Sequence, residues 1–191
     1  MKVSREKMVE NRRRILDVAG TLFRDKGFEA VSVAEVMKAA GLTHGGFYGH
    51  FNSKDDLIAQ SLAHALAARA GQGDSLRDFV DAYLSPRHRD NAADGCPIAG
   101  LAAAIRHQPQ AARAAMTEGL RSQVDRIGKS LPEMDPADRR RAAIGSWAAM
   151  VGALILARAI DDPVLSDEVL EQTRAWIDAG INRGLPHDGH A

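Results

Sequence analysis

The sequence has a single cysteine among 191 residues, which excludes an internal disulfide and the paired-cysteine spacing of a structural zinc site. It also lacks an apolar run of the roughly 18 to 20 residues that a membrane span requires. The longest such stretch, residues 142–157, includes a serine and two glycines. The first ten residues are charged and polar, unlike a signal peptide. We therefore expect a soluble, cytoplasmic protein with no cofactor, no metal and no membrane contact.

The net charge is zero, but the charge is unevenly divided along the chain. Residues 1–54 contain ten Lys or Arg against six Asp or Glu, whereas residues 55–191 contain fifteen against nineteen. A positive N-terminal segment is typical of phosphate binding, because basic side chains displace counterions from the nucleic-acid backbone. A chance fluctuation of this size is the alternative.

Helix signals follow one another along the whole chain, and no β-hairpin signal or repeat interrupts them. The first helix is predicted over residues 5–26, ending at Gly27, and a longer one over residues 54–70. Residues 85–94 contain no apolar run and indicate a surface loop. Pro163 is predicted to end one helix and Ser166 to cap the last. The expected fold class is all-α, with about nine helices.

Two short helices are predicted between residues 31 and 50. Ser32 and Glu35 have the spacing of a capping box, so a helix should begin at Val33. Gly41 is the expected left-handed stop after about two turns, and Thr43 caps a second helix directly afterwards. This is the spacing of a helix-turn-helix, whose second helix enters the DNA major groove.

The residues after the second helix extend this interpretation. Tyr48 and His50 lie near its end, and Ser53 can cap a third helix that begins at Lys54. In a docked complex Tyr48, His50 and Lys54 would gather near one DNA strand and donate to phosphate oxygens. The basic run of residues 12–14 is either a further phosphate contact or an ordinary solvated face.

The second helix has an unusual composition, with glycine at positions 45, 46 and 49. Each glycine lowers helix propensity by about 1 kcal/mol relative to alanine. Few side chains remain to reach base edges, chiefly Thr43 and His44. We expect much of the affinity for double-stranded DNA to come from phosphate contacts, with some readout by methyl groups and by Ser32 and Ala34.

The motifs I-L-D-V-A-G-T-L-F-R-D-K-G-F and F-Y-G-H-F-N-S-K-D-D-L flank the helix-turn-helix. Together they resemble the N-terminal domain of TetR/AcrR-family transcriptional repressors, over about residues 10 to 60. The resemblance implies a DNA-binding domain at residues 1–53 and an effector-binding and dimerisation domain at residues 54–191. The candidate DNA-binding residues belong to the helix-turn-helix and its flanks: Ser32, Val33, Ala34, Thr43, His44, Gly45, Gly46, Tyr48, His50 and Lys54.

The resemblance further implies a homodimer that binds a palindromic operator and is released by a small-molecule or electrophile effector. A dimer is also favoured because two recognition helices double the DNA contacts. The candidate interface residues are Val151, Leu154, Ile155, Arg158, Trp176, Ile177 and Ile181. The candidate ligand-binding residues are His64, Phe79, Tyr83, Cys96, His107, Met116, Trp147 and Met150. Ordinary core packing is the alternative for every residue in both sets.

Cys96 is the most specific candidate for a trigger. It precedes Pro97 at a predicted helix N-terminus, where the helix dipole favours a reactive thiolate, and three basic residues lie at positions 87–89. The alternative is a small buried hydrophobe. Two other functions remain open: a constitutive or architectural DNA-binding protein, and an all-helical enzyme using His64, His107 or Cys96. No paired-carboxylate or phosphate-loop motif supports an enzyme.

Overall fold

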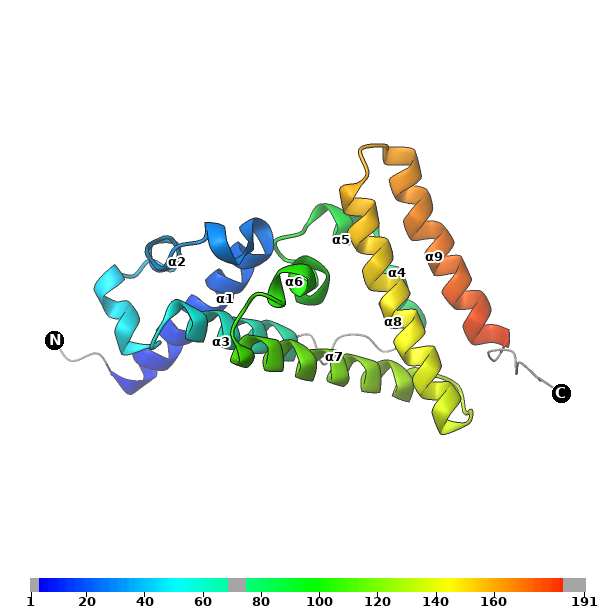
Figure 1. Ribbon diagram of the computed structural model, residues 1–191, viewed down its shortest axis with the longest axis horizontal. Coiled ribbons are helices and arrows are strands. Elements are labelled where there is room, and N and C mark those ends of the chain that lie inside the picture. Colours follow the sequence, from blue (N-terminus) through cyan, green and yellow to red (C-terminus); the bar gives the residue numbers. More distant parts are fainter. Residues whose placement is uncertain (1–3, 69–74, 184–191) are drawn as a thin grey trace. The chain divides into compact units, whose positions relative to one another are not determined.

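The computed structural model describes residues 4–68 and 75–183, with side chains described as far as residue 180. Its described residues form helices and connecting turns, which confirms the all-α prediction (Figure 1). The elements are α1 (Arg5–Ala30), α2 (Val33–Ala39), the 3₁₀ helix η1 (His44–Gly49), α3 (Lys54–Ala67), α4 (Leu76–Tyr83), α5 (Pro86–Asp90), α6 (Pro97–Ile105), α7 (Gln110–Ser130), α8 (Pro136–Ala159) and α9 (Pro163–Arg183).

The contacts divide the chain into two compact units. The first holds α1 to α3 with η1, then α6 and the beginning of α7. The second holds α4, α5, the rest of α7, α8 and α9. The expected boundary between a DNA-binding domain and an effector-binding domain lies between residues 53 and 54. It stays a prediction about function, since α3 follows that boundary but packs against α1 within the first unit.

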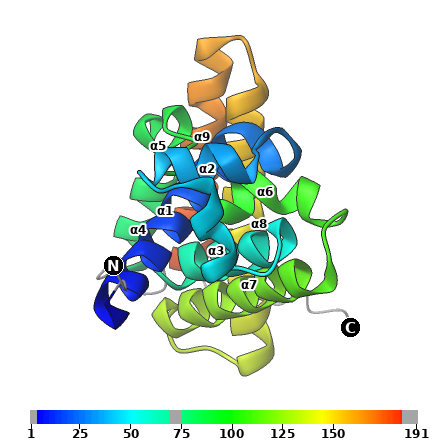
Figure 2. The ribbon, with the colours of Figure 1, turned by 90° about the vertical axis from the view of Figure 1, so that its left-hand side faces the viewer.

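Helices α1 and α3 pack against each other and form the centre of the first unit (Figure 2). Ser4 caps it by accepting from the Lys7 amide at 3.2 Å. Gly27 has a φ of +80°, a conformation that glycine adopts most readily, and the chain kinks there before a last turn ends at Ala30. The predicted stop at Gly27 is thus a kink.

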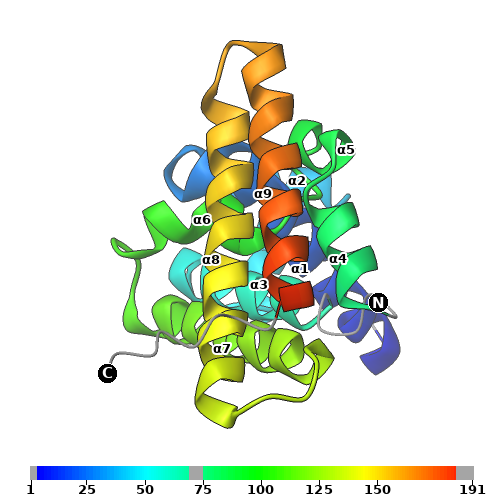
Figure 3. The ribbon, with the colours of Figure 1, turned by 90° about the vertical axis from the view of Figure 1, so that its right-hand side faces the viewer.

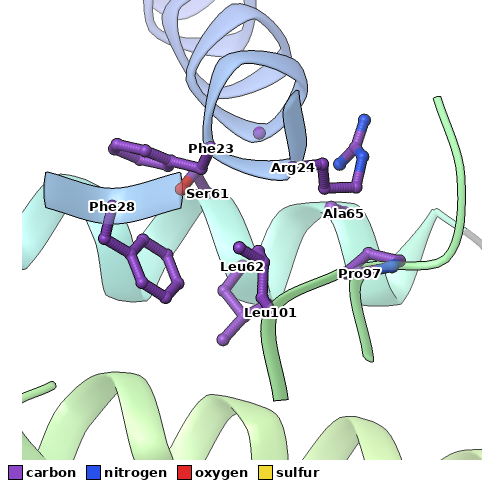
Figure 4. A pocket seen from close by; sticks show the side chains of 9 residues that line it. Phe23, Arg24, Phe28, Ser61, Leu62, Ala65, Pro97 and Leu101 are labelled. Atoms are coloured by element: carbon purple, nitrogen blue, oxygen red, sulfur yellow. The ribbon is translucent and has the colours of Figure 1, made fainter. Parts of the chain in front are cut away.

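Side chains from α1, α3 and α6 converge on one packing centre of this unit (Figure 4). Phe23 and Phe28 lie 5.4 Å apart between ring centres, and the hollow beside them is too narrow to admit a water molecule. Arg24 donates from Nε to the carbonyl of Ala93 at 2.6 Å. These contacts fix α1 and α3 to the chain that leads into α6.

In the second unit, α8 and α9 run side by side as an antiparallel pair, and α4 lies beside α9 (Figure 3). Asp135 caps α8 by accepting from the Ala137 amide at 2.8 Å. By length and composition alone α8 is apolar enough to cross a membrane, a property that core helices of water-soluble proteins share. Its pairing with α9 covers only part of that apolar surface.

Two boundary predictions in this unit are wrong. Residues 86–90 form the short helix α5, because Ser85 accepts from the His88 amide at 3.2 Å and Pro86 suits the first helical position. The last helix begins at Pro163, where the Asp162 carboxylate accepts from the Val164 amide at 2.9 Å. Ser166 is buried and donates to the Ala157 carbonyl at 2.7 Å, so it ties α9 to α8.

Candidate nucleic-acid interface

Helix α2 and the turn after it form as the sequence predicts. Ser32 Oγ accepts from the Glu35 amide at 3.1 Å, while the Glu35 carboxylate pairs with Lys26 Nζ at 2.7 Å. That ion pair lowers the pKa of Glu35 and raises the pKa of Lys26. Gly41 has a φ of +69°, and the Leu42 amide donates to the Met37 carbonyl at 2.8 Å. This bonding reverses the chain sharply after two turns of helix.

The second helix of the pair is η1, a 3₁₀ helix. Thr43 occupies its N-cap position, but its side chain makes no capping hydrogen bond. A Cβ placed at Gly45 or Gly49 would meet no heavy atom within 4 Å, so these glycines leave an open, backbone-rich surface. The glycine content explains the irregular helix, since three poor helix formers in six residues disfavour a regular α-helix.

Aromatic packing holds η1 in place from below. Phe47 is 1% exposed and stacks on Phe51 with 5.6 Å between ring centres. Tyr48 meets Phe47 edge-on at 5.2 Å, yet it is 71% exposed. The buried Phe47 fixes the helix, and this leaves the Tyr48 hydroxyl available to a ligand.

Arg12 of α1 fastens the end of η1, a role that the sequence analysis missed. Its guanidinium donates to the His50 carbonyl and to the side-chain oxygen of Gln60, and it lies 4.5 Å over the Phe51 ring. His50 lies 38 positions after Arg12 in the sequence, and Gln60 lies 48 positions after it. No local sequence pattern therefore indicates the contact. Arg12 is therefore a structural clamp, neither the free phosphate contact nor the solvated side chain that we expected.

The N-terminus of α3 is capped as predicted. Ser53 Oγ accepts from the Asp56 amide at 3.0 Å, and Asp56 accepts in turn from the Asn52 amide at 3.0 Å and from Gln60 Nε2 at 2.6 Å. The Asn52 N–H, and then Gln60, hold the pKa of Asp56 below its usual value. This network joins the end of η1 to the start of α3.

The predicted DNA-binding residues lie mainly on accessible surface. The exposed members are Ser32, Ala34, Thr43, His44, Gly45, Gly46 and Tyr48, and the half-buried members are Val33, His50 and Lys54. Burial, and then the charge of Arg12, lower the pKa of His50. His50 is therefore a neutral donor or acceptor near neutral pH. The open faces of His44 and Tyr48 satisfy the main requirement for a DNA contact.

A capped helix, a glycine turn and a second short helix seated on an aromatic core define a helix-turn-helix module. Residues 15–60 match the family model described as bacterial regulatory proteins, tetR family. This match covers the helix-turn-helix module, and it supports a transcriptional regulator of the TetR family.

Individual relatives agree with this assignment. The chain is 42% identical over 57 residues to the HTH-type transcriptional regulator AcrR of Shigella flexneri, a match covering 30% of this chain and 26% of AcrR. It is 24% identical to the HTH-type transcriptional regulator TtgR of Pseudomonas putida, over 94% of this chain and 93% of TtgR. A TetR-family transcriptional regulator from Cytophaga hutchinsonii has the same fold, with a TM-score of 0.72 and 21% identity over 95% of this chain and 98% of that one.

The candidate ligand-binding residues fall into both units. Phe79, Tyr83, Trp147 and Met150 lie in the second unit, where the first three form one aromatic cluster and Met150 is fully buried. In the first unit His64 pairs with Asp17 at 2.7 Å, His107 is exposed beside Arg106, and Met116 is buried. Within the second unit, the structure brings the aromatic members of the set together.

The candidate interface residues differ in exposure. Leu154 and Ile177 are 0% and 1% exposed, so they fill the core of their own unit, the alternative left open for them. Arg158 is committed internally, since it donates to the carbonyls of His88 at 2.7 Å and Arg89 at 3.0 Å. Ile155 and Trp176 are exposed and Val151 is half-buried. The side chain of Ile181 lies outside the described part of the chain.

Cys96 is 5% exposed at the N-cap position of α6. This burial agrees with the alternative of a small core hydrophobe, and a thiol trigger at this position stays a prediction. The three residues considered for an enzyme have separate surroundings: His64 pairs with Asp17, His107 accepts from Arg106, and Cys96 is buried.

Proposed function

We propose that this protein is a DNA-binding transcriptional repressor that acts as a homodimer on a palindromic operator. The main support is the exposed surface of η1, where Tyr48 is 71% exposed on a helix that buried Phe47 holds in place. Backbone and hydroxyl donors on such a surface suit phosphate oxygens. Positive charge in residues 1–54 adds to the attraction.

Homodimerisation is proposed through α8 and α9. Leu156 is 57% exposed and Trp176 is 59% exposed, and Ile144 and Ile155 add further exposed apolar surface on α8. Trp176 borders a hollow of about 200 Å³ that is also lined by Gly145 and Gly180. Large apolar side chains beside such a hollow are typical of a surface that packs against a second subunit. The two helix-turn-helix modules of one dimer would then read two half-sites about one DNA turn apart.

Release from DNA is proposed to follow binding of a small apolar effector, or modification of Cys96. An effector can shift the protein between states only by as much as its affinity for the two states differs. The effector must therefore favour a state in which the distance between the two helix-turn-helix modules no longer matches the spacing of the operator half-sites.

DNA binding is tested by fluorescence anisotropy with duplexes from the region adjoining the protein's own gene, at several salt concentrations. Tyr48→Phe and Lys54→Gln should weaken binding by a few-fold on every duplex, and loss of the Lys54 charge should reduce the salt slope by about one. Lys129→Gln, which removes an exposed charge near the end of α7, is the matched control and should change neither quantity. Salt-independent binding, or unchanged affinity in both variants, would exclude this surface as the DNA contact.

A further inference from the structure

Trp147 of α8 lies in an aromatic cluster within the second unit. Its ring centre is 6.1 Å from Phe79, with the planes 28° apart, and 5.0 Å from Tyr83 in an edge-on arrangement. Tyr83 also meets His88 edge-on at 4.6 Å. Trp147 is only 4% exposed. Rings from α4 and α8 therefore form one aromatic cluster, in which the indole N–H of Trp147 and the hydroxyl of Tyr83 are buried.

Two buried hydrogen-bond donors lie at this cluster and beside Arg126, the indole N–H of Trp147 and the side-chain amide of Gln123. Within the part of the chain that the structure describes, neither Nε1 of Trp147 nor Nε2 of Gln123 has a hydrogen-bond acceptor, and both atoms are buried. The Gln123 side-chain oxygen already accepts from Arg126 Nη2 at 3.0 Å. The side-chain N–H groups of Gln123 can therefore still donate to a ligand. Burying donors without acceptors is unfavourable. The cluster therefore favours a bound acceptor.

Arg126 adds a positive charge to the same place. Its guanidinium lies 4.2 Å over the ring of Phe79, the ring that also stacks on Trp147. A guanidinium stays charged in proteins and binds carboxylates in a planar, bidentate geometry. Gln123 and Arg126 lie one turn apart on α7 and are both half-buried, so part of each side chain reaches the surface at this edge of the cluster.

We propose that the cluster binds a small aromatic carboxylate. Its ring would pack against Phe79, Tyr83 and Trp147, and its carboxylate oxygens would accept from Gln123, Trp147 and Arg126. This names the chemical class of the effector and, as an effector, rests on the repressor function proposed above. Binding itself does not depend on that function, and it can be measured without DNA.

The test uses the full chain carrying Trp176→Phe, which leaves Trp147 as the only tryptophan. Benzoate is titrated while the fluorescence of Trp147 is recorded, with methyl benzoate and toluene as uncharged and purely apolar comparisons. A saturable change is expected for benzoate, with methyl benzoate weaker and toluene at least about tenfold weaker, because only benzoate offers two charged acceptor oxygens. No response to benzoate, or equal affinity for all three, overturns the proposal.

Two variants assign the binding to the donors. Arg126→Gln and Gln123→Leu should each raise the benzoate Kd by about tenfold, the usual effect of losing a charge-assisted hydrogen bond. Arg140→Gln removes an exposed arginine of α8 and is the matched control, with benzoate affinity unchanged. Benzoate binding that survives in both donor variants overturns the site. If benzoate binds but no duplex does, the site stands and the repressor function fails; benzoate binding that leaves operator affinity unchanged overturns the effector role.

Discussion

The guanidinium of Arg12 lies 4.5 Å from the centre of the Phe51 ring, where η1 gives way to α3. The same group donates to the His50 carbonyl and to the Gln60 side chain, so one residue of α1 holds the end of η1 and the side of α3 together. A helix with three glycines in six residues has little stability of its own. Its position therefore depends on Arg12 and on the stacked Phe47 and Phe51.

Replacing Arg12 should both destabilise the protein and weaken DNA binding. Arg12→Gln is expected to lower the free energy of unfolding by about 1.5 to 3 kcal/mol, since it removes charge-assisted hydrogen bonds and a cation–π contact. Arg12→Lys should recover little, because an ammonium cannot form the planar fork. Denaturant unfolding measures the change. Arg13→Gln, at the exposed neighbouring position, should shift stability by less than about 0.5 kcal/mol; an equal loss there would contradict the clamp.

The two glycines at positions 41 and 45 should respond oppositely to alanine. Gly41 has a φ of +69°, so Gly41→Ala is expected to lower unfolding free energy by about 1 to 2 kcal/mol. At Gly45 a Cβ meets nothing within 4 Å, and Gly45→Ala should raise stability by about 0.5 kcal/mol by restricting the unfolded chain. Thermal unfolding of the two variants in parallel gives the comparison. Equal effects would show that the turn does not require a left-handed residue.

Gly119 of α7 leaves room for Leu66 of α3, since a Cβ there would lie 2.5 Å from Leu66 Cδ1. Gly119→Ala should therefore fail to give the gain of about 1 kcal/mol that alanine normally brings within a helix. Gly128→Ala in the same helix, with its nearest contact at 3.8 Å, should give that gain. In a Leu66→Ala background, Gly119→Ala should become stabilising. Additive effects in this double-mutant cycle would contradict the contact.

The lowered pKa of Asp56 predicts a dependence of stability on pH. The Asn52 N–H, and then Gln60, favour the ionised carboxylate in the folded state. A carboxylate whose folded pKa lies below its unfolded value near 3.8 stabilises the fold above that value, and the contribution disappears as pH falls through the folded pKa.

Asp56→Asn should therefore lower unfolding free energy at pH 7 by about 1 kcal/mol or less, since the group is only half-buried and solvent screens its interactions. The difference from the parent should shrink as pH falls below about 4. Urea unfolding between pH 7 and pH 3 measures both quantities. Asp55→Asn, in the same turn, is the control and should show a smaller effect. A difference that stays constant down to pH 3 would exclude the carboxylate network as its source.

Local signals in the sequence determined the helical elements and the position of the helix-turn-helix. Ser32, Gly41 and Ser53 each act on backbone groups within a few residues, so their roles are readable from spacing alone. Local signals were insufficient where the sequence offers two possible starting points for one helix. Pro163 with Asp162 begins α9, and Ser166 is buried against α8, because tertiary contact uses its hydroxyl for the Ala157 carbonyl.

Tertiary structure alone decided which candidate site residues share a surface and which are buried. Leu154 and Ile155 are adjacent and similarly apolar, yet one is 0% and the other 43% exposed, because the pairing of α8 with α9 selects one side of each helix. Arg12 and its acceptors are far apart in sequence, so only the fold joins them. Short-range hydrogen bonds fix where helices begin and end, whereas side-chain partners depend on how those helices pack.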